Sequence, residues 1–500
     1  MNRTSEPFYT KSLALLTDLY QLTMSYGYWK EGLDSQEAVF HLFFRRPPFN
    51  GGFTIAAGLE SVIQYLNNFH FDATDIAFLR TLKDPEGAPL FENPFLDYLS
   101  TLKFTCKVDA VPEGTVVFPY EPLLRIQGPL IQCQLLESPL LNLINFSSLI
   151  ATKAARMCIA SKGNPIMEFG LRRAQGIDGA LTASRSAYIG GCDATSNVLA
   201  GKQYGIPVMG THSHSWVMVF DEELESFQAY ARCSPNNCVF LVDTYNTIEG
   251  VKKAIAVGKW LRSKGKKLIG IRLDSGDLAY LSIQSRKMLD AAGFQETQII
   301  ASNELDEVLI SELKRQGAQI TLWGVGTHLV TAKEHPALDG VYKLSAIRSP
   351  GGPWKYKLKL SEQMIKVSNP GILQIRRYYN EEGNIADAIY DIHTDLDNKE
   401  CIIIDPLDAT KQRVVSKNLK SEDLLVPIFV DGKQVYELPE LTQIRDRTQD
   451  QLKHFYVGIK RFFNPHQYVV GLEKSLYEQK IALVLQHREK MKDNHLNEKT

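Results

Sequence analysis

The feature that most constrains this chain is a regular alternation of short apolar runs with amphipathic stretches over about residues 135 to 348. Each run has the length of a buried strand, and the stretches between them, such as 248–263, 278–292 and 305–316, place apolar residues at helical spacing. Repeated strand–helix units predict a parallel sheet with right-handed crossovers. Seven candidate strands favour a barrel over a short doubly wound sheet. They lie at 165–170, 206–210, 238–243, 268–273, 298–301, 320–325 and 341–347.

The sequence on either side of this region has a different pattern. Residues 12–30 are predicted as a helix, and residues 37–44 as a strand that ends at a turn rich in proline and glycine. Residues 103–128 are typical of strands interrupted by prolines and glycines. After a break at 349–353 (SPGGP), strand-like alternation returns, and a C-terminal helix is predicted near 470–492. The length of the chain favours two or three domains.

Composition excludes several classes of protein. The chain of 500 residues has 56 basic and 57 acidic residues, so its net charge is −1, which argues against nucleic-acid binding and against electrostatic attachment to membranes. No apolar run approaches the roughly 18 residues that a membrane helix requires, and residues 1–8 lack the apolar core of a signal peptide. The seven cysteines form no CxxC pair, which favours free thiols in a reducing compartment. We therefore predict a cytoplasmic protein.

Polar residues gather just after the predicted strands, and a parallel barrel builds its active site at those strand ends. Arg172 and Arg173 follow the strand predicted at 165–170. Their planar guanidinium groups could clamp phosphates, or they could be solvated residues at a helix start.

The turn at 272–277 (RLDSGD) is the strongest of these clusters. Asp274 and Asp277 could bind ribose hydroxyls or a hydrated Mg²⁺, and one of them could instead cap the following helix. Arg272 belongs to an apolar strand, where a buried cation needs a partner. Capping therefore does not explain the whole turn.

Two further segments could meet an anion. Residues 302–304 (SNE) open a predicted helix, whose free amide groups could bind a phosphate or receive an ordinary N-cap. Residues 324–327 (GVGT) follow a late strand, where glycines let backbone N–H groups approach a phosphate, although glycine turns are common. Asp193, within 190–197 (GGCDATSN), is another candidate, with a helix N-cap as the alternative.

His212 and His214 lie in the segment 210–216 (GTHSHSW), directly after a predicted strand. One interpretation is a metal pair, which also needs later strand-end histidines, and only His328 qualifies. A second is a pair of structural histidines bonded to the backbone. A third is an imidazole that acts as a nucleophile or base towards a phosphate or sugar. The local sequence alone does not choose, and the neighbouring anion-binding residues favour the third.

Taken together, these segments resemble the nicotinate phosphoribosyltransferases, of the type II phosphoribosyltransferase family, over almost the whole chain. Many matches in one order are far more specific than any single motif. The matching segments are 15–24 (LLTDLYQLTM), 190–197, 210–216, 242–245 (VDTY), 272–278, 301–304, 324–327, 343–345 (KLS) and 369–371 (NPG).

The resemblance implies an irregular α/β barrel packed on a strand-rich α+β domain that is built from N- and C-terminal segments. With boundaries taken from this sequence, the strand-rich domain begins with residues 7–134, the catalytic barrel spans 135–348, and the segment 354–490 packs with the first. The family also implies a homodimer whose active site lies near the interface.

The implied reaction joins nicotinate to phosphoribosyl pyrophosphate while ATP is hydrolysed, which gives nicotinate mononucleotide and pyrophosphate for NAD biosynthesis. By resemblance, ATP phosphorylates His214, and the enzyme is an ATP-dependent, ligase-type one. Asp274 and Asp277 would stabilise the positive charge that develops on the ribose. Mg²⁺ or Mn²⁺ is the expected cofactor, and which carboxylate binds it stays open.

The resemblance also assigns substrate contacts. Nicotinate would meet Tyr20, Thr211 and Arg272, and Thr327 would hold the phosphoribosyl phosphate. Phe169 and Arg172 match positions near the pyridine ring and the phosphates. The remaining expected substrate contacts are Ser302, Asn303, Gly324 and Gly326.

The nearest rival is the nicotinamide-using relative, nicotinamide phosphoribosyltransferase. The amide of its substrate would need an acidic acceptor, and Asp193 keeps that possibility open. Arg272 does not exclude this rival, because both relatives have an arginine in the turn. The segments 210–211, 302–304 and 324–327 favour the nicotinate enzyme.

Overall fold

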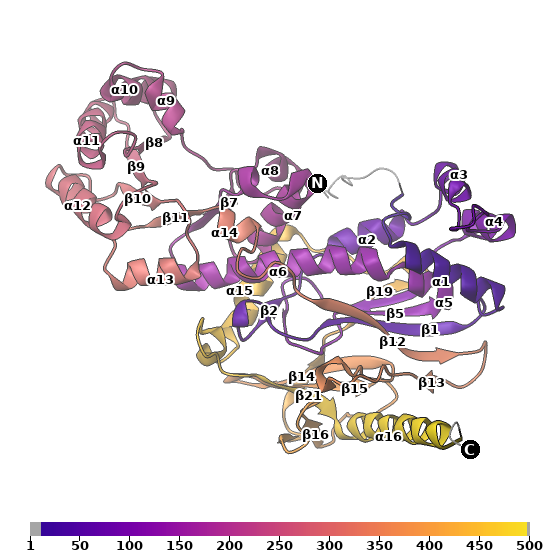
Figure 1. Ribbon diagram of the computed structural model, residues 1–500. Coiled ribbons are helices and arrows are strands. Elements are labelled where there is room, and N and C mark those ends of the chain that lie inside the picture. The colour runs from indigo at the N-terminus through magenta and orange to yellow at the C-terminus, as the bar shows by residue number, and fades with distance from the viewer. Residues whose placement is uncertain (1–11, 498–500) are drawn as a thin grey trace. The chain divides into compact units, whose positions relative to one another are not determined.

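The computed structural model describes residues 12–497, with side chains up to residue 490, and divides into two compact units (Figure 1). The first unit combines the chain up to Ser148 with the chain from Ala337 onwards, and the second is Leu149–Pro336. The first predicted domain begins at residues 7–11, which lie outside the described residues. Residues 1–8, expected to lack a signal peptide, lie outside them as well.

The first unit is built around a seven-stranded antiparallel sheet in the order β13-β12-β1-β5-β3-β19-β20. The central strand β1 (Glu37–Phe44) is buried along nearly its whole length, because its apolar residues face packed layers on both sides of the sheet. The other strands are β3 (Lys107–Ala110), β5 (Leu124–Pro129), β12 (Gly340–Arg348), β13 (Lys355–Tyr356), β19 (Val426–Val430) and β20 (Lys433–Gln434). Two short strands, β2 (Thr54–Ile55) and β4 (Val116–Val117), form a separate antiparallel pair.

Helices of the first unit add apolar faces to this core. They are α1 (Leu19–Lys30), α2 (Leu59–Asn67), α3 (Ala73–Thr81), α4 (Asn93–Thr101) and α5 (Leu130–Leu135), and α15 (Leu441–Lys453) is a further helix of this unit. The helix α6 (Glu137–Ser161) begins in the first unit and ends in the second. The helix predicted at 12–30 begins only at Leu19, because residues 13–17 form turns.

A second sheet of the first unit has the order β17-β16-β21-β15-β14-β18. Its centre holds a fully buried ion pair, in which Arg377 Nη2 lies 2.5 Å from Asp387 Oδ2. Arg377 also donates to Gln451 Oε1, and the Tyr468 hydroxyl donates to Asp387, which completes this polar cluster as buried charges require. The elements are β14 (Leu373–Asn380), β15 (Gly383–Asp391), β16 (Cys401–Ile404), β17 (Gln412–Val415), β18 (Lys420–Asp423), β21 (Val469–Glu473) and the helix α16 (Lys474–Asn497).

The second unit is a parallel sheet in the order β7-β6-β11-β10-β9-β8. The first strand pairs with the last, which is how a barrel closes, and the sheet is interrupted between β7 and β8. An irregular α/β barrel is therefore confirmed. The strands are β6 (Ile166–Glu168), β7 (Ala194–Thr195), β8 (Cys238–Leu241), β9 (Leu268–Leu273), β10 (Gln298–Ala301) and β11 (Leu322–Val325).

Helices follow the barrel strands, and Figure 1 shows α11 and α12 along one side of β8, β9 and β10. Sequence and structure agree closely here, since the runs predicted at 268–273 and 298–301 match β9 and β10 residue for residue. The helices are α7 (Gly176–Ile189), α8 (Val198–Tyr204), α9 (His214–Met218), α10 (Glu223–Cys233), α11 (Thr247–Ser263), α12 (Leu278–Ala291), α13 (Glu307–Arg315) and α14 (Thr327–Val330).

Two predicted barrel strands are wrong. The run at 341–347 is β12, which pairs antiparallel with β1 in the first unit instead of closing the barrel. The run at 206–210 forms only an isolated bridge between Val208 and Thr195. Pro207 has no N–H to donate, and β7 offers this segment only two residues to pair with.

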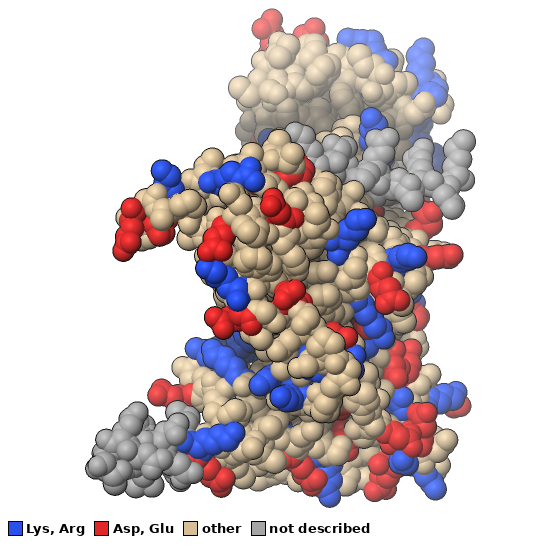
Figure 2. Space-filling view, turned by 90° about the vertical axis from the view of Figure 1, so that its right-hand side faces the viewer, with Lys and Arg blue, Asp and Glu red and all other residues tan. Residues whose placement is uncertain are grey.

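The surface agrees with the near-neutral composition. On the face shown in Figure 2, lysines and arginines alternate with acidic residues among the described residues, without a continuous surface of one sign. None of the described helices combines the length and apolar content that a membrane span requires.

Candidate active site

Arg272, near the end of β9, links several predicted site residues within the barrel unit. Its Nε–H donates to Ser302 Oγ at 2.8 Å, Nη1–H donates to Thr211 Oγ1 at 3.2 Å, and Nη2–H donates to Asp274 Oδ1 at 3.0 Å. Only 16% of its side chain is exposed. The partner that the sequence required for this cation is therefore a set of three groups, from the ends of β9 and β10 and from the segment 210–214.

Asp274 is held as a carboxylate. Burial acts to raise the pKa of Asp274, but the Ser302 hydrogen bond and the Arg272 charge outweigh burial and lower the pKa. Ser302 accepts from Arg272 and donates its own hydroxyl to Asp274, so it relays between the two charges. The three side chains form one preorganised unit.

Phe169 forms an apolar wall beside this unit. Its ring is half-buried against the barrel core, and Arg272 Cζ lies 5.9 Å from the ring centroid. Gly324 packs against the ring, since a Cβ at that position would lie 2.7 Å from Phe169 Cδ2. Gly324 is thus required for the position of the ring, and this requirement explains the glycine better than a turn does.

His214 is the first residue of α9 and is part-exposed. Its Nδ1 lies 3.1 Å from Thr244 Oγ1, and its Nε2 lies 3.7 Å from Asp274 Oδ2. The imidazole therefore has a hydroxyl at one nitrogen and a carboxylate near the other, and it stays accessible to a substrate.

His212 has a different environment, which matches the structural interpretation. Its Nε2 accepts the backbone N–H of Leu241 at 3.3 Å, and its ring lies 4.9 Å from that of Tyr230. Burial lowers the pKa of His212, so its neutral form is favoured. Because backbone N–H already occupies Nε2, His212 supports the 210–214 segment and is a poor metal ligand.

Thr211 and Tyr20 are placed differently from each other. The Thr211 hydroxyl accepts from Arg272 and donates to the His212 carbonyl oxygen at 3.2 Å, so it orients Arg272. Tyr20 belongs to α1 of the first unit and is half-exposed, and burial with the nearby Glu137 charge raises its pKa. Direct contact of either residue with nicotinate stays a prediction.

Asp243 is a site residue that our sequence analysis did not single out. Its Oδ2 accepts the backbone N–H of Asp274 at 2.8 Å and the hydroxyl of Ser275 at 2.6 Å, which fixes the 272–277 turn. Its Oδ1 is buried without a hydrogen-bond partner. The available signal was its place in the VDTY segment, directly after the buried strand β8.

The two other candidate aspartates have structural partners. Asp277 Oδ1 accepts the N–H of Tyr280 at 3.0 Å and caps α12, as the capping alternative predicted. Asp193 precedes β7, and its Oδ2 accepts the N–H of Ile166 at the start of β6. Asp193 therefore lies at the N-terminal ends of these strands, away from the C-terminal ends that carry Arg272.

The anion-binding segments contain further polar groups. Asn303 has a φ of 90°, a left-handed value that asparagine tolerates better than most residues, and its side chain accepts the N–H of Glu304. Thr327 begins α14 after Gly326, and its hydroxyl lies 3.2 Å from Glu304 Oε1. Arg172 lies exposed in a 3-10 turn, Leu171–Arg173.

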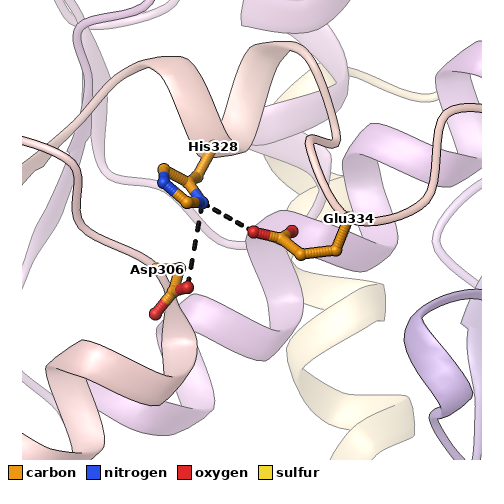
Figure 3. A group of neighbouring side chains, drawn as sticks. All are labelled: Asp306, His328 and Glu334. Atoms are coloured by element: carbon orange, nitrogen blue, oxygen red, sulfur yellow. Dashed lines mark hydrogen bonds and ion pairs between the residues drawn. The ribbon is translucent and has the colours of Figure 1, made fainter.

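Asp306, His328 and Glu334 form a compact group whose possible ligand atoms lie within 4.8 Å of one another (Figure 3). Cations already satisfy this group, since Lys153 Nζ lies 2.6 Å from Glu334 Oε2 and Lys333 Nζ lies 3.2 Å from His328 Nε2. It is therefore an ion-paired cluster, and His328 gives no support to a metal pair at His212 and His214.

Comparison with known proteins identifies the relatives of this chain. Three models of nicotinate phosphoribosyltransferase match it in succession, the N-terminal domain over residues 15–145, the family over 165–351 and the C-terminal domain over 373–480. A nicotinate phosphoribosyltransferase from Bacillus subtilis is 41% identical and covers 95% of this chain and 96% of its own length. One from Dictyostelium discoideum is 40% identical, with 93% and 87% covered.

Solved structures give the same result. The crystal structure of human nicotinic acid phosphoribosyltransferase matches with a TM-score of 0.81 and 32% identity, over 93% of this chain and 99% of that chain. The nicotinate-nucleotide pyrophosphorylase from Pyrococcus furiosus, 23% identical with a TM-score of 0.69, shares the fold over 90% of this chain and 99% of that chain. On the evidence of sequence, fold and strand-end residues, the chain belongs to the nicotinate phosphoribosyltransferase family.

Proposed function

We propose that this protein is a nicotinate phosphoribosyltransferase of NAD biosynthesis. It joins nicotinate to phosphoribosyl pyrophosphate, gives nicotinate mononucleotide and pyrophosphate, and couples the reaction to hydrolysis of ATP to ADP and phosphate. The observation that carries the proposal is the oriented guanidinium of Arg272 beside the Phe169 ring.

Arg272 has unused N–H donors that can bind a carboxylate. A guanidinium has five N–H groups, and three of these are taken by Ser302, Thr211 and Asp274. One N–H on each terminal nitrogen is left, which suits the two oxygens of a planar carboxylate. The Phe169 ring supplies an apolar face for the pyridine, and a neutral amide would gain less from the cation.

We infer that the phosphoryl group of ATP is transferred to Nδ1 of His214. The Asp274 carboxylate near Nε2 favours a proton on that nitrogen, and the lone pair of Nδ1 then faces the Thr244 hydroxyl. Nδ1 attacks the γ-phosphorus, the bond to the β,γ-bridging oxygen breaks, and ADP leaves with that electron pair. Water later cleaves the N–P bond and releases phosphate.

Cleavage of the donor's C1–O bond builds positive charge on ribose. Asp274 and the capping residue Asp277 lie in the turn that would face the sugar, and both are oxygen anions suited to that charge. Asp243, with an unpaired buried oxygen, fits a hard cation, so it and Asp277 would hold Mg²⁺ together with substrate phosphates. Bound Mg²⁺ would neutralise the pyrophosphate leaving group.

The phosphoribosyl phosphate would bind between the two anion-binding segments. Gly326 adds no side chain where β11 meets α14, Gly324 positions the Phe169 ring at the same strand end, and Ser302 and Asn303 lie at the neighbouring strand end. The exposed Arg172 is available for the pyrophosphate end. These roles follow from strand order, since β10 and β11 are paired neighbours.

We also propose that the protein is a cytoplasmic homodimer. Several large apolar side chains beside the site are exposed, which is typical of a surface that a second copy covers. These are Val208, Met209, Met218, Val219 and Tyr245. All seven cysteines are free thiols, which is compatible with a reducing compartment. Sedimentation analysis tests the dimer, and a monomer at micromolar concentration would contradict it.

The substrate assignment is tested by competition. Purified enzyme is incubated with phosphoribosyl pyrophosphate, ATP, Mg²⁺ and limiting equal amounts of nicotinate and nicotinamide, and both mononucleotides are quantified. We expect nicotinate mononucleotide almost alone. A preference for nicotinamide would show that the protein has the rival activity. Asp193 could not then be the acceptor of the amide, because it lies at the strand ends opposite Arg272.

A further inference from the structure

Glu304 lies where the proposed function needs a phosphate. It follows β10 by three residues, and 56% of its side chain is exposed. Asn303 turns the backbone before it and accepts its N–H, which directs the side chain towards Thr327. The inference below rests on the proposed role of Thr327 as a phosphate contact.

The two oxygens of Glu304 have different partners. Oε1 accepts the Thr327 hydroxyl at 3.2 Å. Oε2 lies 3.2 Å from His328 Nε2 and 3.5 Å from Lys333 Nζ. The slight burial of Glu304 acts to raise its pKa, and the Thr327 bond with the nearby charges outweighs burial and lowers it. Glu304 is therefore an anion at neutral pH.

His328, one of the two partners of Oε2, is anchored independently of Glu304. His328 is mostly buried, and its Nδ1 lies 2.6 Å from Glu334 Oε1 and 3.7 Å from Asp306 Oδ2 (Figure 3). Lys153, itself buried, pairs with the other oxygen of Glu334. The Glu304 carboxylate thus lies between the anchored His328 on one side and the hydroxyl of Thr327 on the other.

This arrangement conflicts with phosphate binding at Thr327. A threonine hydroxyl has one proton to donate, and Glu304 accepts it. A phosphate at the same hydroxyl would also meet the carboxylate at close range, which is repulsive. Oε2 already lies near Lys333 and His328, so a small rotation that moves Oε1 from Thr327 towards these side chains frees the hydroxyl.

We propose that Glu304 is a competing anion at the donor's phosphate site, released from Thr327 towards Lys333 and His328 when the phosphate binds. Glu304 then weakens donor affinity and enforces a preference for a ligand with enough negative charge to displace it. Lys333 favours the released position, so it supports donor binding through Glu304.

The proposal predicts opposite effects for two substitutions. Glu304→Gln keeps the shape and removes the charge, so we expect phosphoribosyl pyrophosphate to bind roughly three- to tenfold more tightly, the size of one screened charge pair. Lys333→Met leaves Glu304 on Thr327, so we expect weaker donor binding by a similar factor. Glu312→Gln, which removes an exposed carboxylate on α13 paired with Arg315, is the matched control.

Affinity is measured by calorimetry of the full-length protein with phosphoribosyl pyrophosphate and Mg²⁺, and with inorganic phosphate, without turnover. In the double variant Glu304→Gln with Lys333→Met, the Lys333 effect should vanish, because it acts through Glu304. Weaker donor binding by Glu304→Gln, or an undiminished Lys333 effect in the double variant, would overturn the proposal. Since binding is read directly, this result is separate from the substrate competition that tests the proposed function.

Discussion

Replacement of Arg272 by alanine perturbs the nicotinate site most directly. Two N–H groups of the guanidinium are left for the nicotinate carboxylate, and each charge-assisted bond contributes about 1.5 kcal/mol. Their loss costs about 3 kcal/mol, which corresponds to roughly a hundredfold rise in the apparent KM for nicotinate. The KM for ATP should change far less, because Thr244 still contacts His214, and Ser302 and Asp243 still hold Asp274 when Arg272 is removed.

The assay compares the steady-state KM for nicotinate and for ATP in the wild type, Arg272→Ala and Arg272→Lys. The lysine variant keeps the charge without the fork, so it should fall between the other two. Arg315→Ala, which removes an exposed arginine paired with Glu312, is the control for a general charge effect. Equal rises in both KM values would refute the assignment of Arg272 to the pyridine site.

Three other substitutions test separate parts of the account. Gly324→Ala places a methyl 2.7 Å from the Phe169 ring, so the KM for nicotinate should rise several-fold while circular dichroism stays native. Thr244→Val removes the hydroxyl beside His214 Nδ1 and should slow labelling by ATP without a change in donor affinity, which single-turnover labelling and calorimetry check. Burial lowers the pKa of Lys480 to about 8, so the charged form destabilises the fold below pH 8, and this cost falls as pH rises from 8 to about 10.5. Lys480→Met should therefore raise the unfolding free energy by up to about 3 kcal/mol at pH 7 and progressively less above pH 8, and an equal gain at all pH values in urea titrations would contradict this.

The barrel could be predicted from sequence because its strands are short, apolar and regularly spaced. The two strands that were wrong show what the pattern lacks. The run at 341–347 has the composition of a buried strand. This composition does not distinguish a strand of a parallel barrel from a strand buried in an antiparallel sheet. At 206–210 the pattern was apolar, but Pro207 and the short β7 limit pairing to one bridge.

The site could be predicted as a set of strand ends, but not as a set of contacts. The roles of the two histidines separated only when His212 was seen to accept a backbone N–H while His214 stayed accessible. Asp243 needed the fold to bring its strand end beside the 272–277 turn. Asp193 lies at the opposite strand ends, which composition and spacing could not reveal.

The central claim is that His214 carries a phosphoryl group from ATP during turnover. Purified protein is incubated with γ-labelled ATP and Mg²⁺, and protein-bound phosphate is measured after acid and base treatment in the wild type, His214→Ala and His212→Ala. We predict acid-labile, base-stable label in the wild type, none in His214→Ala and reduced but detectable label in His212→Ala. Absence of label in the wild type, or label that persists in His214→Ala, would contradict the account.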